Sequence, residues 1–213
     1  MRIGTWNLDG RWDARHRDLV ARLECDVLLM TEVPDQVDIP GMRGHRTTEP
    51  MVPGRAWAGV FATEVTGLAD PHPAAALATV DGLRVCSSVL PWQGSGRWYP
   101  WGGDNDGDRT AYAVDAIAAA APRIWGGDWN TSFAPTGYAV APTSRTLLWS
   151  AAMRLGLVIT TTALVHQEGS DLTIDHIAVP TSWSTLEVEH HRAECNGVLL
   201  SDHDAYVVEV HRT

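Results

Sequence analysis

The sequence predicts an α/β fold in which two β-sheets pack face to face and helices cover their outer sides. Both halves of the chain contain several short strand patterns, and each half also contains helical patterns. The 213 residues, of which 45% are hydrophobic, suit one compact core and leave little length for a second. We therefore expect residues 1–213 to form a single domain.

The beginning of the chain alternates strand and helix. Residues 2–8 are typical of a short strand, and Asp13 is a suitable N-cap for the helix that follows. Residues 26–31 contain the run Val-Leu-Leu-Met, which is too short for a helix and typical of a strand buried on both faces. Glu32 then falls at the exit of that strand.

The remaining elements follow from the same rules. Residues 34–53 are rich in Pro, Gly and Asp and indicate a loop, and residues 91–108 indicate a long, Trp-rich surface loop. Helices are expected around residues 111–121 and 147–155. The expected strands cover residues 55–62, 76–80, 83–90, 123–126, 157–161, 173–179, 186–189 and 205–210.

The chain is acidic, with 16 basic and 26 acidic residues and a formal net charge of −10. Such a charge repels polyanions, so it argues against tight nonspecific binding of nucleic acid. It does not argue against a phosphate substrate, because a bound metal ion can dominate the local charge of an acidic pocket. Nucleic acid therefore stays a candidate substrate with only weak support from charge.

The expected setting is the cytoplasm. No segment approaches the roughly 20 apolar residues of a membrane span, and the first residues lack the order of a secretory signal. Cys25, Cys86 and Cys195 are widely spaced and odd in number, which suggests neither a disulfide framework nor a Cys-type zinc site. We expect a monomer with free thiols and no membrane partner.

Polar residues suited to binding a cation stand at the expected strand exits. They are carboxylates, amides and two histidines: Asn7, Asp9, Glu32, Asp128, Asn130, Asp175, His176, Asp202 and His203. Oxygen ligands suit a hard cation such as Mg²⁺ or Mn²⁺, and zinc is a poorer fit. Each residue alone has an ordinary explanation as turn chemistry, so the order and the flanking residues decide the interpretation.

Five short segments carry these residues in order. They are Thr5-Trp-Asn7-Leu-Asp9, Leu29-Met-Thr-Glu32, Gly126-Gly-Asp128-Trp-Asn130, Ile174-Asp175-His176-Ile177 and Ser201-Asp202-His203. Their succession resembles the signature segments of the endonuclease/exonuclease/phosphatase superfamily, which shares the deoxyribonuclease I-like four-layer α/β sandwich. One such segment alone is a weak signal, whereas five in order along nearly the whole chain are specific.

The resemblance implies a metal site. In the family, the Asn of the first segment and the Glu of the second hold the catalytic metal, which here means Asn7 and Glu32. Asp9 resembles an additional acidic residue of the apurinic-endonuclease branch, and Asp202 would stay near the metal. The resemblance therefore implies Mg²⁺ or Mn²⁺ as the cofactor.

The resemblance also implies catalytic roles. Asp128 would orient or deprotonate the attacking water, and Asn130 would position that water and the phosphoryl oxygens. His203, steadied by Asp175, would contact the phosphate. The physical requirements agree, because phosphodiester hydrolysis needs a cation, a positioned water and a donor for the developing charge. A carboxylate bonded to a histidine also favours the imidazolium form.

The chain departs from the family pattern at the end of the strand expected over residues 83–90. Many relatives carry a further histidine where Val89 stands here, so a scheme with two histidines is in doubt. The apurinic-endonuclease branch uses a tyrosine nearby, and Tyr99 and Tyr112 are the candidates. The acid that protonates the leaving group is therefore not assigned.

The Trp-rich loop holds the candidates for substrate binding. Arg97 and Arg109 flank it and are placed to meet a substrate phosphate, and Trp98 is a candidate for stacking on a base. Packing of the loop tryptophans as a hydrophobic lid is the alternative. Residues 104–108 resemble a calcium loop only in part, because the glycine comes too early and no closing Glu follows.

The other histidines have structural interpretations. Alternation along a strand points His176 away from Asp175, which predicts a structural role. His190 and His191 lie in a polar stretch and are expected on a solvated surface.

Three functions compete. The first is a metal-dependent phosphodiesterase or nuclease that acts on nucleic acid or a nucleotide-like small molecule. The second is a phosphomonoesterase that acts on a small phosphorylated metabolite. The third is a catalytically silent binding domain of the same fold, which the retained polar segments argue against, because buried unpaired carboxylates destabilise a domain. The acidic charge and scattered basic residues favour a short or small substrate.

Overall fold

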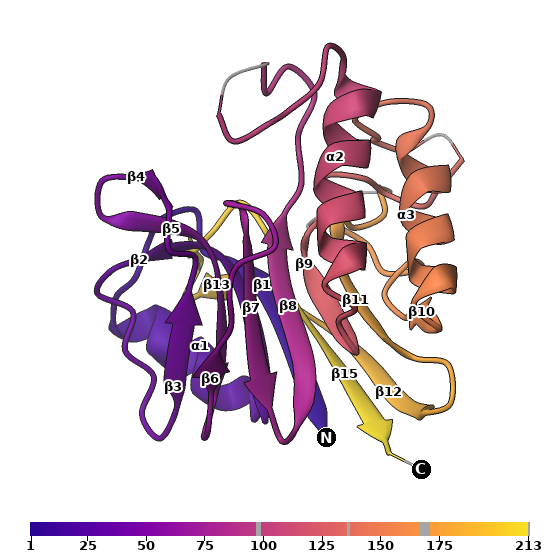
Figure 1. Ribbon diagram of the computed structural model, residues 1–213. Coiled ribbons are helices and arrows are strands. Elements are labelled where there is room, and N and C mark those ends of the chain that lie inside the picture. The colour runs from indigo at the N-terminus through magenta and orange to yellow at the C-terminus, as the bar shows by residue number, and fades with distance from the viewer. Residues whose placement is uncertain (97–98, 136, 167–170, 213) are drawn as a thin grey trace.

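The structure is a computed structural model that describes residues 1–96, 99–135, 137–166 and 171–212. Two mixed β-sheets pack face to face, with one helix on the outer side of the first sheet and two on the outer side of the second (Figure 1). The predicted four-layer α/β sandwich is confirmed.

The first sheet has seven strands in the order β12-β15-β1-β2-β5-β3, with β4 also paired to β5. β1 and β2 run parallel, and the other neighbours are antiparallel. The strands are β1 (Arg2–Asn7), β2 (Val27–Pro34), β3 (Arg43–Arg46), β4 (Pro50–Val52), β5 (Arg55–Ala62), β12 (Ser184–His191) and β15 (Ala205–His211).

The second sheet has six strands in the order β10-β11-β9-β8-β7-β6. β8 and β9 run parallel, and the other neighbours are antiparallel. The strands are β6 (Thr66–Gly67), β7 (Ala75–Val80), β8 (Leu83–Val89), β9 (Ile124–Asp128), β10 (Leu157–Ile159) and β11 (Asp175–Pro180). A separate hairpin joins β13 (Glu194–Cys195) to β14 (Val198–Leu199).

Three α-helices lie in the described residues: α1 (Ala14–Leu23), α2 (Asp106–Ala119) and α3 (Ser144–Arg154). Asp13 caps α1 as expected, since its side chain accepts hydrogen bonds from the backbone N–H groups of Arg15 and His16. In the part of the chain that the structure describes, no helix has the length and apolar character needed to cross a membrane.

Three apolar layers hold the sandwich together. Leu19, Val20 and Leu23 of α1 pack on the outer face of the first sheet, and α2 and α3 pack on the outer face of the second. Between the sheets, β-branched and small residues such as Ile3 and Ile177 meet in the third layer. Because both faces of each central strand are covered, polar side chains are displaced to the strand ends.

The structure differs from the prediction in two segments. Residues 34–53, expected as loop, contain β3 and β4, which form by pairing with β5 at the sheet edge. Pro50 is tolerated there because an edge strand needs fewer backbone donors. The loop expected over residues 91–108 ends early, because Asn105 caps α2 by accepting a hydrogen bond from the backbone N–H of Asp108.

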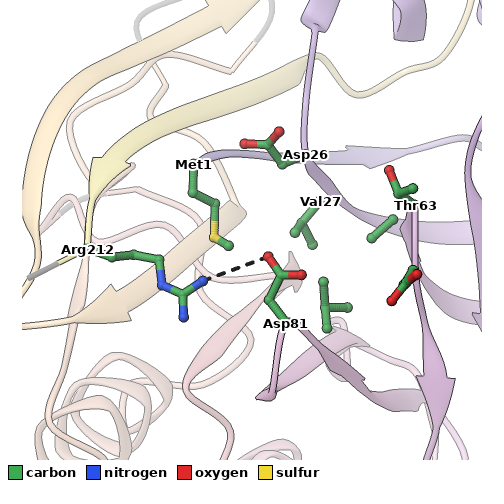
Figure 2. Close-up of a pocket in the computed structure, with 9 residues that line it drawn as sticks. Met1, Asp26, Val27, Thr63, Asp81 and Arg212 are labelled. Atoms are coloured by element: carbon green, nitrogen blue, oxygen red, sulfur yellow. Dashed lines mark ion pairs between the residues drawn. The ribbon is translucent and has the colours of Figure 1, made fainter.

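A cavity of about 490 Å³ opens at the end of the sandwich where β1 and β2 begin (Figure 2). Asp26, Glu64 and Asp81 supply carboxylates to its lining, and the Arg212 guanidinium lies 3.8 Å from Asp81. β1 spans six residues from this end to Asn7, so the cavity and the far end of the strand are roughly 17 Å apart.

Candidate active site

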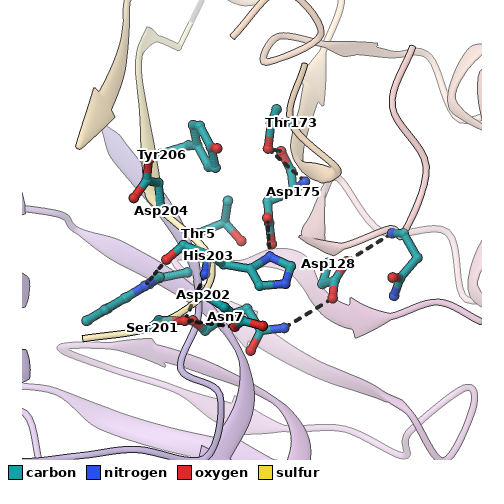
Figure 3. A network of polar contacts seen from close by, with 12 residues as sticks. Thr5, Asn7, Asp128, Thr173, Asp175, Ser201, Asp202, His203, Asp204 and Tyr206 are labelled. Carbon is teal, nitrogen blue, oxygen red and sulfur yellow. Dashed lines mark hydrogen bonds and ion pairs between the residues drawn. The ribbon is translucent and has the colours of Figure 1, made fainter. Parts of the chain in front are cut away.

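Polar residues from both sheets meet at the end of the sandwich opposite this cavity (Figure 3). Asn7 ends β1, and Glu32 lies near the end of the parallel strand β2. Asp128 ends β9, and Asp175 begins the antiparallel strand β11, so that the two aspartates are cross-strand partners. Strand direction therefore brings four segments far apart in sequence to one edge.

Asn7 joins the two sheets. Its side-chain amide donates to Asp128 Oδ2 at 3.1 Å and to Glu32 Oε1 at 3.3 Å, and its oxygen accepts from the backbone N–H of Asp9 at 2.9 Å. The side chain is 1% exposed, so these hydrogen bonds replace lost hydration. Asn7 thus fixes Glu32 and Asp128 relative to each other.

Asp175 and His203 form a buried pair. His203 Nδ1 lies 2.7 Å from Asp175 Oδ2, and Ser201 holds the backbone by accepting from the His203 N–H at 3.1 Å. The Ser201 hydroxyl also donates to the Asn7 carbonyl at 2.7 Å, which links this pair to β1. Figure 3 shows His203 between Asp175 and the end of β1.

The pKa of His203 is raised to about 10. Burial is the largest single influence and lowers the pKa, but the nearby carboxylates of Asp175, Asp128 and Asp202 together outweigh it. His203 is therefore an imidazolium near neutral pH. With Nδ1 engaged by Asp175, the donor at Nε2 is directed elsewhere.

The pKa of Asp128 is raised as well, but there burial acts in the direction of the shift. Burial raises its pKa to about 7, Asp175 adds to the rise, and His203 opposes it. The carboxyl accepts hydrogen bonds from the backbone N–H of Asn130 at 2.9 Å and from Asn7. A carboxyl with this pKa can accept a proton near neutrality, as a general base requires.

Three of the seven non-glycine residues with positive φ among the described residues lie at the site. Asp9, Glu32 and Asn130 have φ angles of +48°, +50° and +48°, in the left-handed region that non-glycine residues rarely adopt. Asn130 is held there by donating from its amide to the Leu90 carbonyl at 2.9 Å. Strain of this kind, which costs about 1–3 kcal/mol per residue, occurs preferentially at functional sites.

The expected metal ligands are partly assembled. Asn7 and Glu32 are in direct contact, Asp9 reaches Asn7 through its backbone, and Asp202 lies beside Ser201 at 3.5 Å. Two of the acids also pair with arginines: Asp9 with Arg11 at 2.8 Å and Glu32 with Arg55 at 2.7 Å. The donor set consists of carboxylate and amide oxygens, which fits a hard divalent cation.

The endonuclease/exonuclease/phosphatase family profile matches residues 4–203, which includes every segment described above. The chain belongs to this family.

Solved structures with the same fold cover nearly the whole chain. A 3′ phosphatase from Neisseria bound to a product DNA hairpin is 17% identical, with a TM-score of 0.72 and complete coverage of both chains. An AP endonuclease from Archaeoglobus fulgidus is 15% identical, with a TM-score of 0.70 and 98% of each chain covered. A 3′-5′ exonuclease from Neisseria meningitidis is 19% identical, with a TM-score of 0.68, covering 98% of this chain and 99% of its own. No curated protein matches by sequence.

Among the described residues, three candidates for substrate contact or leaving-group protonation, Arg109, Tyr99 and Tyr112, do not join the network. Arg109 is buried in α2 and ion-paired with Asp106. Tyr112 packs against His72, and Tyr99 is mostly exposed. Arg97 and Trp98 lie outside the described residues, and Val89 packs in the apolar core as its side chain dictates.

His176, His190 and His191 lie in strands, and their positions follow from the pairing of those strands. His176 lies on the opposite face of β11 from the site, as alternation predicts, between the Thr131 carbonyl and the Thr161 hydroxyl. His190 and His191, expected on a solvated surface, are only partly exposed, with 21% and 28% of their side chains accessible. Both lie half-buried in β12, because each imidazole lies within hydrogen-bonding distance of an acid, Asp204 or Glu189.

Sequence reasoning missed three residues at the site. Arg11 and Arg55 pair with the expected ligands, and His166 lies beside His203 with ring centroids 5.2 Å apart. Among the described residues, His166, Asp175 and His203 form a group whose possible ligand atoms lie within 4.8 Å of one another. None of the five family segments includes Arg11, Arg55 or His166, so only their positions in the fold show that they belong to the site.

Proposed function

We propose that this protein is a divalent-metal-dependent phosphoesterase that hydrolyses a phosphodiester by attack of water at phosphorus. The substrate would be nucleic acid or a nucleotide-like small molecule. The supporting observation is the hydrogen-bonded network that joins Asn7, Glu32 and Asp128 across the two sheets, next to the Asp175–His203 pair.

Mg²⁺ or Mn²⁺ would be held by Asn7 and Glu32, with Asp9 and Asp202 close by. A bound cation neutralises charge on the nonbridging phosphoryl oxygens and lowers the pKa of bound water. The chain's own contribution is a dense set of oxygen donors on a rigid edge of the sheet.

Asp128 would orient the attacking water and accept its proton, a role that its pKa of about 7 supports. Asn130, adjacent to it, would position the water and a phosphoryl oxygen. The His203 imidazolium would donate to a phosphoryl oxygen on which negative charge develops, and Asp175 would keep that imidazole oriented.

A phosphomonoesterase acting on a small metabolite is the second candidate. The net charge of −10 favours a short or small substrate over a long polyanion. One of the similar structures is a 3′ phosphatase and others are nucleases, so both ester classes occur among proteins with this fold. A silent binding domain is disfavoured because Asp128 and Asp175 are costly to bury without a task. The cytoplasmic location and the monomeric state also stay proposals.

The test is an assay with Mg²⁺ or Mn²⁺ against single- and double-stranded DNA, RNA, bis-nitrophenyl phosphate and a set of phosphomonoesters. Wild type should hydrolyse at least one of these, and Glu32→Ala and His203→Ala should each reduce the rate by at least about 100-fold. Hydrolysis that survives both substitutions would refute the site assignment.

A further inference from the structure

Two buried polar atoms at the site have no hydrogen-bond partner among the described residues. One is Asp175 Oδ1, the oxygen that does not contact His203, and the other is His166 Nδ1. A buried carboxylate oxygen left without a donor costs about 1–3 kcal/mol, so such an atom calls for a physical explanation.

The two unpartnered atoms belong to neighbouring side chains. His166, Asp175 and His203 each offer an atom that lies within 4.8 Å of the atoms offered by the other two. The rings of His166 and His203 meet edge to face, at an interplanar angle of 71°. The group is compact enough for one bridging water or a small side-chain rotation to join His166 to Asp175.

The backbone that carries His166 is fixed next to Asp175. The His166 N–H donates to the Asp171 carbonyl at 2.8 Å, and the Thr173 N–H donates to the Leu164 carbonyl at 2.8 Å. The hydroxyl of Tyr206, a fully buried residue of β15, donates to the Val165 carbonyl at 2.9 Å. His166 is therefore held by the segment that precedes β11 and by β15 of the first sheet.

We propose that His166 is a positioning residue for the Asp175–His203 pair: its Nδ1–H donates to Asp175 Oδ1, directly or through one water. Asp175 is then held by two imidazoles, one on each oxygen, and its carboxylate plane is fixed. A carboxylate with a single partner can rotate about its own axis, whereas one with two cannot, so His203 keeps one direction toward the substrate. This role rests on the proposed function.

His166 does not occupy the place of the additional histidine that many relatives carry where Val89 stands here. β8 ends in Val89, which faces the core, and offers no imidazole. His166 comes from the segment that precedes β11 and approaches the site from the side of Asp175. The second imidazole acts through Asp175 and does not substitute for the missing one chemically.

Three substitutions of His166 test the role of Nδ1. Asn places its amide nitrogen near the position of Nδ1, Gln places it near Nε2, and Ala removes both. We expect His166→Ala and His166→Gln to lower kcat about 10- to 100-fold with KM changed less than about twofold, and His166→Asn to retain most of kcat. On an Asp175→Asn background, His166→Ala should cause little further loss, because both changes remove one interaction.

A second readout does not depend on activity. The imidazole N–H that His203 shares with Asp175 should give a downfield proton resonance in wild type and in His166→Asn, and the resonance should broaden or disappear in His166→Ala. The control is His191→Ala, which removes a half-buried histidine paired with Glu189 and should change neither kcat nor this resonance.

The outcomes separate the two proposals. An unchanged kcat and an unchanged His203 resonance in His166→Ala would overturn the positioning role while leaving the phosphoesterase intact. Equal loss in the Asn, Gln and Ala variants, matched by equal loss of thermal stability, would show a merely structural residue and overturn it as well. If wild type is inactive or His203→Ala is fully active, the proposed function fails, and the resonance still decides whether His166 orients Asp175.

Discussion

The two ends of the sandwich both contain acidic residues, but they arrange them differently. At one end, Asp128 and Asp175 are buried and engaged by Asn7 and His203. At the other, Asp26, Glu64 and Asp81 are exposed around a cavity of about 490 Å³, and the Arg212–Asp81 pair is long, at 3.8 Å.

This difference shows what distinguishes a candidate active site from a cavity that has acidic residues around it. Exposed carboxylates keep their hydration and their ordinary chemistry, so a cavity lined by them needs no further explanation. Buried carboxylates such as Asp128, whose pKa burial raises, and Asp175, which His203 contacts, require a task to justify their cost. The cavity has volume but exposed acids, whereas the opposite end has the buried, hydrogen-bonded acids that the proposed function uses.

The largest effect is expected from Asp128→Asn. The amide preserves shape but cannot accept a proton, so kcat should fall by about 10²- to 10⁴-fold. The matched control is Asp81→Asn at the cavity, which should leave kcat within about twofold. Steady-state kinetics with the best substrate from the panel measures both, and an equal effect of the two substitutions would show that the two ends do not differ in function.

The second largest effect is expected from metal binding, which should depend on residues at one end of the sandwich and not at the other. A cation that binds the folded state at 100 times its Kd stabilises it by about 2.7 kcal/mol, so Mg²⁺ should raise the Tm of wild type and EDTA should reverse this. Glu32→Ala should lose the Tm shift, while Asp81→Asn should retain it. A shift that depends on Asp81 instead would place the cation in the cavity.

His176 sharpens the comparison within one strand, because it is as buried as Asp175 but lies on the other face of β11. Burial lowers its pKa from 6.5 to about 4, and Asp175 opposes this only weakly. As the pH falls, His176 is therefore protonated in the unfolded chain before it is protonated in the folded protein. The contribution of the neutral, buried imidazole to the free energy of unfolding is complete above about pH 6.5 and is lost as the pH falls toward 4. The size of the loss is about 3 kcal/mol.

Urea unfolding of wild type and His176→Gln at pH 7 and pH 5 measures this contribution. The variant should be less stable at pH 7 but should lose less stability between the two pH values. His72, which is also buried with a pKa of about 4, leaves part of the acid sensitivity in both proteins. Identical pH dependence in the two proteins would contradict the assignment.

The smallest effect is expected from Arg212→Gln. Its contact with Asp81 is long and both side chains are exposed, so the free energy of unfolding should change by less than about 0.5 kcal/mol. Activity should not change. A larger loss of stability, or any loss of activity, would show that the Arg212–Asp81 pair contributes more than its exposure suggests.

Local patterns in the sequence were sufficient for much of the fold. The run before Glu32 has strand length and is buried on both faces, and Asp13 caps α1, because these features depend on neighbouring residues. β3 and β4 were missed because their stability comes from pairing with β5, which no local pattern records.

Site residues that stand at strand ends could be predicted from the sequence. Site residues whose side chains reach the site from another segment could not. Asn7, Asp128 and Asp175 follow from strand direction once the segments are recognised. Arg55 reaches Glu32 past Gly10, where a Cβ atom would lie about 2 Å from the guanidinium, and His166 depends on a hairpin register. Such contacts arise from packing geometry and leave no spacing rule in the chain.

The order in which ribosomes make these segments has a consequence for folding. A nascent chain that has emerged only through β11 already contains Asp128 and Asp175, but it lacks His203 as well as β12 and β15, and without β15 one edge of β1 is unpaired. During that interval, Asp175 would lack the imidazole of His203 that contacts it in the folded protein. The second sheet should thus stay loosely docked until synthesis reaches β15, and hydrolytic competence should appear late and abruptly.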